Sequence, residues 1–182
     1  MNKENREIEV KFKIETPQEI IKKLRQLGAQ FQGKAFEKTI RFDTENDSLA
    51  KQDKFLRLRS GFKNVITFKA KVANDKFKER EEIETEVKDQ EKMRQILERL
   101  GFTKLRVMEK YRQKWNLGGV EIVIDKLPMG TFIEIEGSES EIKKTAEKLE
   151  LDFQESLTNT YWDLWVEYAK KNKLSANNIV FS

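Results

Sequence analysis

Charged and apolar residues alternate along several short stretches of this chain. Residues 7–11 read Glu-Ile-Glu-Val-Lys. In a β-strand this order places the charged side chains on one face and the aliphatic ones on the other. The same alternation recurs at 56–59, 68–71, 82–87 and 134–136. Some of these stretches are basic and others acidic, a sorting that a merely solvated surface does not need, so we expect a sheet with one apolar and one charged face.

An imperfect internal repeat divides the chain into two halves. Residues 7–11 recur in 82–88, Leu24-Arg-Gln-Leu-Gly28 recurs as Leu97-Glu-Arg-Leu-Gly101, and Glu37-Lys38 with Arg41 recurs as Glu109-Lys110 with Arg112. The order of the motifs is the same in both copies. The repeat therefore predicts that each half folds as a strand, a helix and three further strands.

Helix boundaries and strand lengths follow from local signals. Thr16-Pro17-Gln-Glu19 is typical of a capping box with proline at the first helical position, and Gly28 predicts the end of that helix. We expect a second helix from Asp89 to Gly101, a third that begins with the capping box of Ser138, and a fourth near 158–171 whose aromatic stripe indicates packing. Strands are expected at 35–43, 53–60, 64–71, 104–117, 119–127 and 130–137.

These elements predict an α+β fold. Two βαβββ halves supply eight antiparallel strands, whose apolar faces the helices cover. Turning the charged faces toward each other produces a closed or nearly closed barrel with a charged lumen, because closure removes exposed strand edges. We expect one domain over residues 1–171 and a disordered tail over residues 172–182.

Composition excludes several kinds of chemistry. The 182 residues include no Cys and no His, so thiolate or imidazole metal sites and Ser-His-Asp or Cys-His catalysis are ruled out. Any metal must be bound by oxygen, which favours Mg²⁺ or Mn²⁺. Lys+Arg number 36 against 32 Asp+Glu, a net charge of +4 that is not concentrated in a block. The first residues lack an apolar leader, so a cytoplasmic protein is expected.

The predicted charged face contains both bases and acids. By strand parity it includes Lys11, Arg57, Arg59, Lys69, Lys71, Arg106, Lys110, Arg112 and Lys114 together with Glu7, Glu9, Glu82, Glu84, Glu86, Asp125, Glu134 and Glu136. A chain of phosphates with divalent metals suits such a surface, since the bases bind phosphate oxygens and the carboxylates bind the metals. The alternative is a solvated sheet with cross-strand ion pairs worth about 0.2–1 kcal/mol each.

The ordered motifs resemble those of a known family. Glu7-x-Glu9-x-Lys11, Leu56-Arg57-Leu58-Arg59, Thr67-Phe68-Lys69, Glu82-x-Glu84, Lys110-x-Arg112, Asp125 and Glu134-Ile-Glu136 are similar to the motifs of the CYTH family, the triphosphate tunnel metalloenzymes. The resemblance runs from about residue 6 to residue 168. It implies an eight-stranded tunnel that binds a triphosphate with Mg²⁺ or Mn²⁺. The family includes thiamine triphosphatases, inorganic tripolyphosphatases, RNA triphosphatases and class IV adenylate cyclases.

The resemblance also implies roles for individual residues. Phosphate would be bound by Arg57, Arg59, Lys69, Lys110 and Arg112, with Lys71 and Lys114 as further candidates. One metal would be bound by Asp125, Glu134, Glu136 and Glu84, and a second by Glu7 and Glu9. Lys11 matches the lysine that orients or deprotonates the attacking water.

Two departures from the family pattern bear on the reaction. Thr39 and Arg41 stand where the second strand of the family often has Asp and Tyr, and the His-Phe pair that precedes the first motif in class IV cyclases is absent. The second departure favours a metal-dependent triphosphatase over a class IV-type adenylate cyclase. A non-catalytic binder of polyphosphate or RNA 5′-triphosphate ends is a third hypothesis. The expected partner is a small triphosphate-containing molecule, without DNA or a membrane, and a homodimer is compatible with the sequence.

Overall fold

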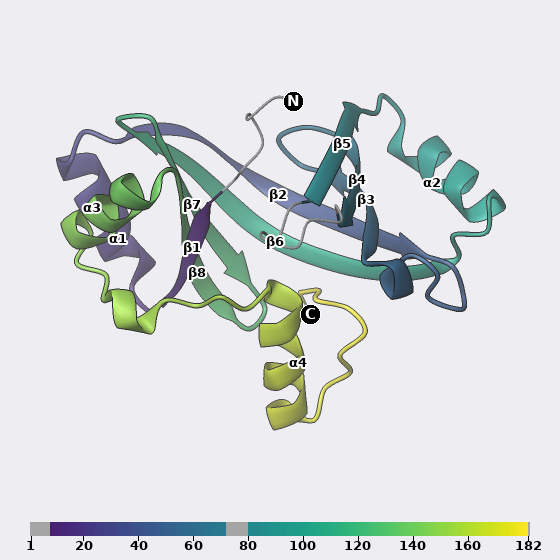
Figure 1. Cartoon of the computed structure of the whole chain (residues 1–182). Coiled ribbons are helices and arrows are strands. Elements are labelled where there is room, and N and C mark those ends of the chain that lie inside the picture. The colour runs from purple at the N-terminus through teal and green to yellow at the C-terminus, as the bar shows by residue number, and fades with distance from the viewer. Residues whose placement is uncertain (1–7, 72–79, 182) are drawn as a thin grey trace. The chain divides into compact units, whose positions relative to one another are not determined.

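The computed structural model describes residues 8–71 and 80–181, which form eight strands and four α-helices (Figure 1). The strands are β1 Glu9–Ile14, β2 Gln30–Asp43, β3 Lys54–Ser60, β4 Val65–Lys71, β5 Arg80–Glu86, β6 Lys104–Leu117, β7 Val120–Leu127 and β8 Gly130–Glu136. The helices are α1 Pro17–Gln26, α2 Gln90–Arg99, α3 Glu139–Lys148 and α4 Tyr161–Asn172, with 3₁₀ turns at Ala50–Gln52 and Phe153–Glu155. The predicted order of strand, helix and three strands in each half is confirmed.

The eight strands form one antiparallel sheet in the order β1-β8-β7-β6-β2-β3-β4-β5. The α+β class and the eight antiparallel strands are therefore confirmed. Within the described residues β1 pairs only with β8 and β5 only with β4, so hydrogen bonds do not close the sheet into the fully closed barrel that the sequence allowed.

Two compact units make up the chain, and they do not coincide with the two sequence halves. Unit 1 comprises the described parts of 1–36 and 110–182, and unit 2 comprises those of 37–109. In unit 1, β1 of the first half pairs with β8 of the second. In unit 2, β4 of the first half pairs with β5 of the second. Each unit thus combines strands from both copies of the repeat.

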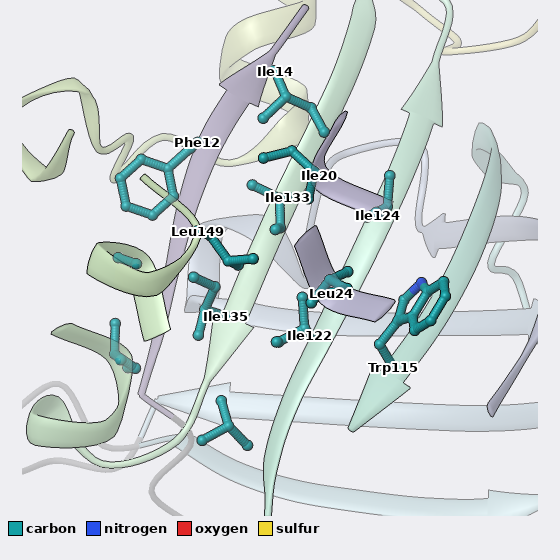
Figure 2. Packing of buried hydrophobic residues seen from close by; sticks show 13 residues of the cluster. Phe12, Ile14, Ile20, Leu24, Trp115, Ile122, Ile124, Ile133, Ile135 and Leu149 are labelled. Carbon is teal, nitrogen blue, oxygen red and sulfur yellow. The ribbon is translucent and has the colours of Figure 1, made fainter. Parts of the chain in front are cut away.

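An aliphatic core fills unit 1 between its strands and two helices. Figure 2 shows side chains of β1, β7 and β8 directed toward those of α1 and α3. Ile133 and Ile135 of β8 are fully buried, as are Leu24 of α1 and Leu149 at the end of α3. Full burial of an aliphatic side chain of this size stabilises the fold by about 1.5–3 kcal/mol. The helices therefore cover the apolar face of this part of the sheet, as predicted.

Unit 2 has a separate core of the same construction. Phe42 of β2 and Leu58 of β3 are buried beside Leu97 of α2. Phe42 and Leu58 alternate along their strands with charged residues, so burying one face leaves the other for the charges. The apolar face is again the one that a helix covers.

The helix starts agree with the predictions, with one difference in detail. Asp89 caps α2, and Ser138 forms a capping box with Glu141 at α3. At α1 the predicted capping box is absent, because the Thr16 hydroxyl donates to the Glu19 carboxylate at 2.9 Å instead of accepting from a backbone N–H. Pro17 still occupies the first turn, where a missing N–H costs nothing.

The residues after α4 pack against unit 1 as far as they are described. Ile179 is fully buried, and the ring of Phe181 lies 5.3 Å from that of Tyr111. The prediction of a disordered tail over 172–182 is therefore corrected for residues up to 181. The segment is mostly polar, but its apolar residues Ile179 and Phe181 pack against other side chains in the folded chain.

Within the described stretches, every helix is too short and too polar to cross a lipid bilayer.

Replacing Leu24 by Ala tests the core of unit 1. Because Leu24 is fully buried, the loss of contacts and the cavity left behind should lower the free energy of unfolding by about 2–5 kcal/mol. Leu27, at the end of the same helix, is 37% exposed, so Leu27→Ala should cost less than about 1 kcal/mol. Urea denaturation measures both values. Equal losses would show that α1 does not cover the core.

Candidate functional site

The charged face of unit 1 is built by β1, β6, β7 and β8. Side chains alternate across a strand, so burial of Ile133 and Ile135 in the core places Glu134 on the opposite face. The register pairs Glu134 with Lys11 of β1, and Asp125 of β7 with Arg112 of β6. Four adjacent strands thus bring the predicted residues together.

Asp125 lies at the centre of this face and is fully buried. Arg112 binds it in a bidentate manner, from Nε to Oδ1 at 2.7 Å and from Nη2 to Oδ2 at 2.5 Å. Lys110 Nζ donates to Oδ2 at 3.0 Å, and the hydroxyl of Tyr161 donates to the same oxygen at 2.9 Å. Such charge-assisted bonds offset the cost of removing the carboxylate from water.

The pKa of Asp125 reflects this balance. Burial alone would raise the pKa, but the Lys110 ammonium and the Arg112 guanidinium overcome that effect and hold the pKa of Asp125 well below its usual range. The carboxylate therefore stays ionised in the folded protein.

Lys11 occupies the neighbouring position on the same face. Its ammonium group is 2.9 Å from Oε1 of Glu134, and Arg112 Nη2 contacts Oε2 of the same carboxylate at 2.7 Å. The ammonium group also lies 4.5 Å from the centre of the Tyr161 ring, and that of Lys110 lies 5.5 Å from it. Lys11 is only 5% exposed, so these contacts take the place of most of its hydration.

Tyr161 enters this face from α4, an element outside the sheet. Burial, Asp125 and Glu134 all raise the pKa of its hydroxyl well above the usual value, so the group stays protonated and acts as a donor. Its ring also packs edge-on against Phe132 of β8 at 5.4 Å. The aromatic stripe predicted to be packing therefore includes one residue that contacts the charged side chains.

Further along the same strands lies a row of carboxylates. Glu136 of β8 is in register with Glu9 of β1 and with Glu121 of β7. Lys114 of β6 contacts Glu121 at 3.3 Å. Like charges in directly opposed positions repel one another, so cations are favoured beside this row.

Unit 2 contains a second group of charged residues, on β3, β4 and β5. Lys69 Nζ lies 2.6 Å from Glu82 Oε2, and Arg59 Nη2 lies 3.5 Å from Glu84 Oε2. Thr67 of β4 is fully buried and links the strands on either side of it. Its hydroxyl accepts from Arg57 Nε of β3 at 3.3 Å and donates to Glu84 of β5 at 2.7 Å.

Arg57 and Arg59 are close enough to affect one another. Burial and then the nearby Arg59 charge lower the pKa of Arg57, and Glu82 and Glu84 only partly offset this. The folded state therefore disfavours the charge of Arg57, through its burial and then through repulsion by Arg59. An anion that binds here relieves both costs.

The predicted metal ligands do not form a metal site in their present pairing. Within the parts of the chain that are described, three carboxylates never converge in a way that could hold a metal ion. Asp125 accepts from two cations and a hydroxyl, and Glu134 is paired through both oxygens. A divalent ion at either residue would have to displace those cations.

Several predicted site residues are brought together and others are not. Lys11, Lys110, Arg112, Asp125 and Glu134 form one connected group in unit 1, and Arg57, Arg59, Lys69 and Glu84 form another in unit 2. Glu9 and Glu136 lie in the carboxylate row, and Lys114 lies beside Glu121. Glu7 and the side chain of Lys71 lie outside the described residues.

Sequence reasoning missed Thr67 and Tyr161. Thr67 is part of the motif Thr67-Phe68-Lys69, but its hydroxyl is uncharged and so did not indicate a role in the charged group. The capping box of Thr160 fixes Tyr161 as the first residue of α4, a signal that is present in the sequence. That signal does not indicate which surface the helix meets.

The family of this chain follows from comparison of its sequence. The family described as "CYTH domain" matches residues 5–160, so the chain belongs to the CYTH family. A relative from Methanocaldococcus jannaschii, named "Putative adenylate cyclase MJ0240", is 34% identical over 146 residues, which are 79% of this chain and 83% of that protein.

Solved structures agree with this membership. The PH1012 protein of Pyrococcus horikoshii is 28% identical and superposes with a TM-score of 0.70 over 86% of this chain and 97% of that one. A Hippeastrum protein, described as "Putative adenylyl cyclase HpAC1" with a dominant triphosphatase activity, has a TM-score of 0.59 over 90% of this chain and 96% of that one. At 17% identity its likeness is one of fold alone.

Replacing Asp125 by Asn tests the buried ion pairs. The variant removes the buried negative charge that Lys110 and Arg112 share, so the free energy of unfolding at pH 7 should fall by about 3–5 kcal/mol. Because the folded-state pKa of Asp125 is lowered, the ionised carboxylate stabilises the protein above about pH 4 and ceases to do so as the pH falls through the lower value.

The difference between wild type and Asp125→Asn should accordingly be constant from pH 7 to pH 5 and shrink toward pH 2. Chemical denaturation across this range measures it. Glu147→Gln, at an exposed position of α3, is the control and should leave stability nearly unchanged. A difference that does not depend on pH would contradict the ionised state.

Proposed function

We propose that this protein is a metal-dependent triphosphatase that hydrolyses the terminal phosphoanhydride of tripolyphosphate or of a small organic or nucleoside triphosphate. The observation that carries the proposal is the buried group in unit 1, in which Lys11, Lys110 and Arg112 gather around the carboxylates Asp125 and Glu134. Membership of the CYTH family, whose enzymes act on triphosphates, supports it.

The proposed roles follow from the chemistry of each side chain. Arg57, Arg59 and Lys69 in unit 2 bind phosphate oxygens, because guanidinium groups match them in geometry and ammonium groups in charge. In unit 1 Arg112 and Lys110 stabilise the negative charge on the phosphoryl group that is transferred. Lys11 orients the attacking water or removes its proton.

The metal belongs to the proposal through the family, whose enzymes depend on divalent ions. Mg²⁺ or Mn²⁺ is the expected cofactor, because hard cations suit oxygen ligands and the chain has no Cys or His. Asp125 and Glu134, as they are paired with Lys11, Lys110 and Arg112, do not provide a site for this ion. The roles proposed for the side chains therefore do not depend on where the ion binds.

A class IV-type adenylate cyclase is the second candidate, since the Methanocaldococcus relative is named as an adenylate cyclase. In that reaction the ribose hydroxyl attacks the α-phosphorus and pyrophosphate leaves. Hydrolysis is preferred here because the His-Phe pair of class IV cyclases is absent from residues 3–7, which read Lys-Glu-Asn-Arg-Glu. A binder of polyphosphate or RNA 5′-triphosphate ends would release no product.

A product assay with the Lys11→Ala variant tests the reaction. Wild-type protein with Mg²⁺ or Mn²⁺ should convert tripolyphosphate to orthophosphate and pyrophosphate, followed by ³¹P NMR, and a chelator should abolish turnover. Lys11→Ala should lower kcat by roughly 10²–10⁴-fold, because that is the usual contribution of a general acid or base to the rate. KM should change less than kcat. Lys13→Ala, at an exposed position of the same strand, is the control.

ATP and thiamine triphosphate, assayed in parallel, separate the rival functions. Cyclic AMP from ATP with tripolyphosphate untouched would establish the cyclase. Tight binding of tripolyphosphate without any product would establish the binder.

Replacing Arg57 by Met tests the phosphate group of unit 2. Because the folded state disfavours the charge of Arg57, the ligand-free variant should melt at the same or a higher temperature, while tripolyphosphate should bind at least tenfold more weakly, a loss of about 1.4 kcal/mol. Calorimetry measures both quantities. Lys63→Ala, which removes an exposed ion pair with Glu86, should leave the affinity unchanged. Lower stability with unaltered affinity would mark Arg57 as a structural residue.

A further inference from the structure

Tyr161 connects α4 with the residues to which we assign the reaction. It is the first residue of the helix, and the family match ends one residue before it, at 160. Although it lies beyond the matched region, Tyr161 is 8% exposed and reaches the centre of the charged group in unit 1. Its ring lies 4.5 Å from the Lys11 ammonium group, and its hydroxyl donates to Asp125 at 2.9 Å.

We propose that Tyr161 is a positioning residue that holds the ammonium group of Lys11 in the orientation required for its action on the attacking water. This inference rests on the proposed triphosphatase reaction and identifies a residue on which the rate of that reaction depends.

The need for such a residue follows from the nature of lysine. Its ammonium group ends a flexible stem of four carbons, so one ion pair leaves it free to swing about the carboxylate. The bond to Glu134 at 2.9 Å fixes one direction, and the Tyr161 ring restricts another. A cation over an aromatic face gains about 0.5–2 kcal/mol, most where water is excluded, and Lys11 is 5% exposed.

The position of Tyr161 is itself fixed at three points. The N–H of Leu157 donates to the carbonyl of Lys11 at 2.7 Å, which attaches the segment before α4 directly to β1. Thr160 and Asp163 form a capping box that sets the start of the helix. The bond from the Tyr161 hydroxyl to Asp125 then prevents the ring from turning away.

The hydroxyl and the ring therefore have separable functions. The hydroxyl acts on Asp125, and through it on Lys110 and Arg112. The ring lies 4.5 Å from the Lys11 ammonium group and farther, at 5.5 Å, from that of Lys110, so its stronger contact is with Lys11. Tyr161→Phe removes the first contact and keeps the second, whereas Tyr161→Leu removes both.

The first experiment measures the orientation of Lys11 without any turnover. An ammonium group over an aromatic face places its neighbouring methylene protons in the ring current, which shifts their NMR signals upfield. In protein labelled with ¹³C-lysine, the Lys11 signal is assigned by its loss in Lys11→Arg. It should be shifted upfield in wild type and Tyr161→Phe and return to the ordinary lysine position in Tyr161→Leu.

The matched control is Trp165→Leu. Trp165 is a buried aromatic residue of the same helix that stacks on Tyr168, so its loss disturbs the packing of α4 without removing the ring beside Lys11. The Lys11 signal should stay upfield in this variant. Circular dichroism checks that each variant is folded, and Tyr161→Met replaces Tyr161→Leu if the latter does not fold. A signal that is insensitive to loss of the Tyr161 ring would overturn the proposal.

The second experiment tests the consequence for the reaction. Tyr161→Leu should lower kcat for tripolyphosphate by about 10²-fold with KM changed less than about threefold, since a displaced catalytic group slows the step more than it weakens binding. Tyr161→Phe, which keeps the ring and removes the hydroxyl, should lower kcat clearly less than Tyr161→Leu does. In a Lys11→Ala background, Tyr161→Leu should cost no more than Tyr161→Phe, because the contribution of the ring acts through Lys11.

The outcomes distinguish this proposal from the function on which it rests. Losses that add in the double variant, or an equal loss of kcat in Trp165→Leu, would make Tyr161 a structural residue. If wild-type protein turns over no triphosphate, the proposed function fails, and the NMR comparison still decides whether Tyr161 fixes Lys11.

Discussion

A buried carboxylate remains ionised only where enough positive charge and enough hydrogen-bond donors surround it, and Asp125 is the position at which this chain meets that requirement. Moving such a charge out of water costs several kcal/mol, which a single weak contact does not recover. Arg112 and Lys110 of β6 and Tyr161 of α4 together satisfy the carboxylate, which itself lies on β7. The arrangement of β6, β7 and α4 therefore depends on this residue.

The same constraint accounts for the composition of the charged face. Three cations in unit 1 face two carboxylates, and each cation has at least one of these carboxylates as a partner. The three cations and the two carboxylates are thus held by one another in the folded chain. A metal ion at Asp125 or Glu134 can enter only by exchanging partners with a lysine or an arginine.

Alternation of side chains allows one strand to serve both stability and chemistry. In β8, Ile133 and Ile135 fill the core while Glu134 between them joins the charged group. The helices are needed because an apolar face must be covered. That requirement is readable from the sequence, and so the strands, the start of α2 and α3, and the charged face of the sheet were predicted. The start of α1 was also predicted, although Thr16 makes a different hydrogen bond from the one expected.

The sequence by itself determined the α+β class, the order of the elements and the face of each strand on which Lys11, Arg112, Asp125 and Glu134 lie, because these depend on periodicity and on contacts between near neighbours in the chain. Only the tertiary structure decided that β1 pairs with β8 and β5 with β4, so that each compact unit mixes the two sequence halves. It also decided that Ile179 is buried and that Tyr161 lies against Lys11. These contacts join residues far apart in the chain, and the free energy that selects them comes from burial and charge pairing in the folded protein, which no local pattern encodes.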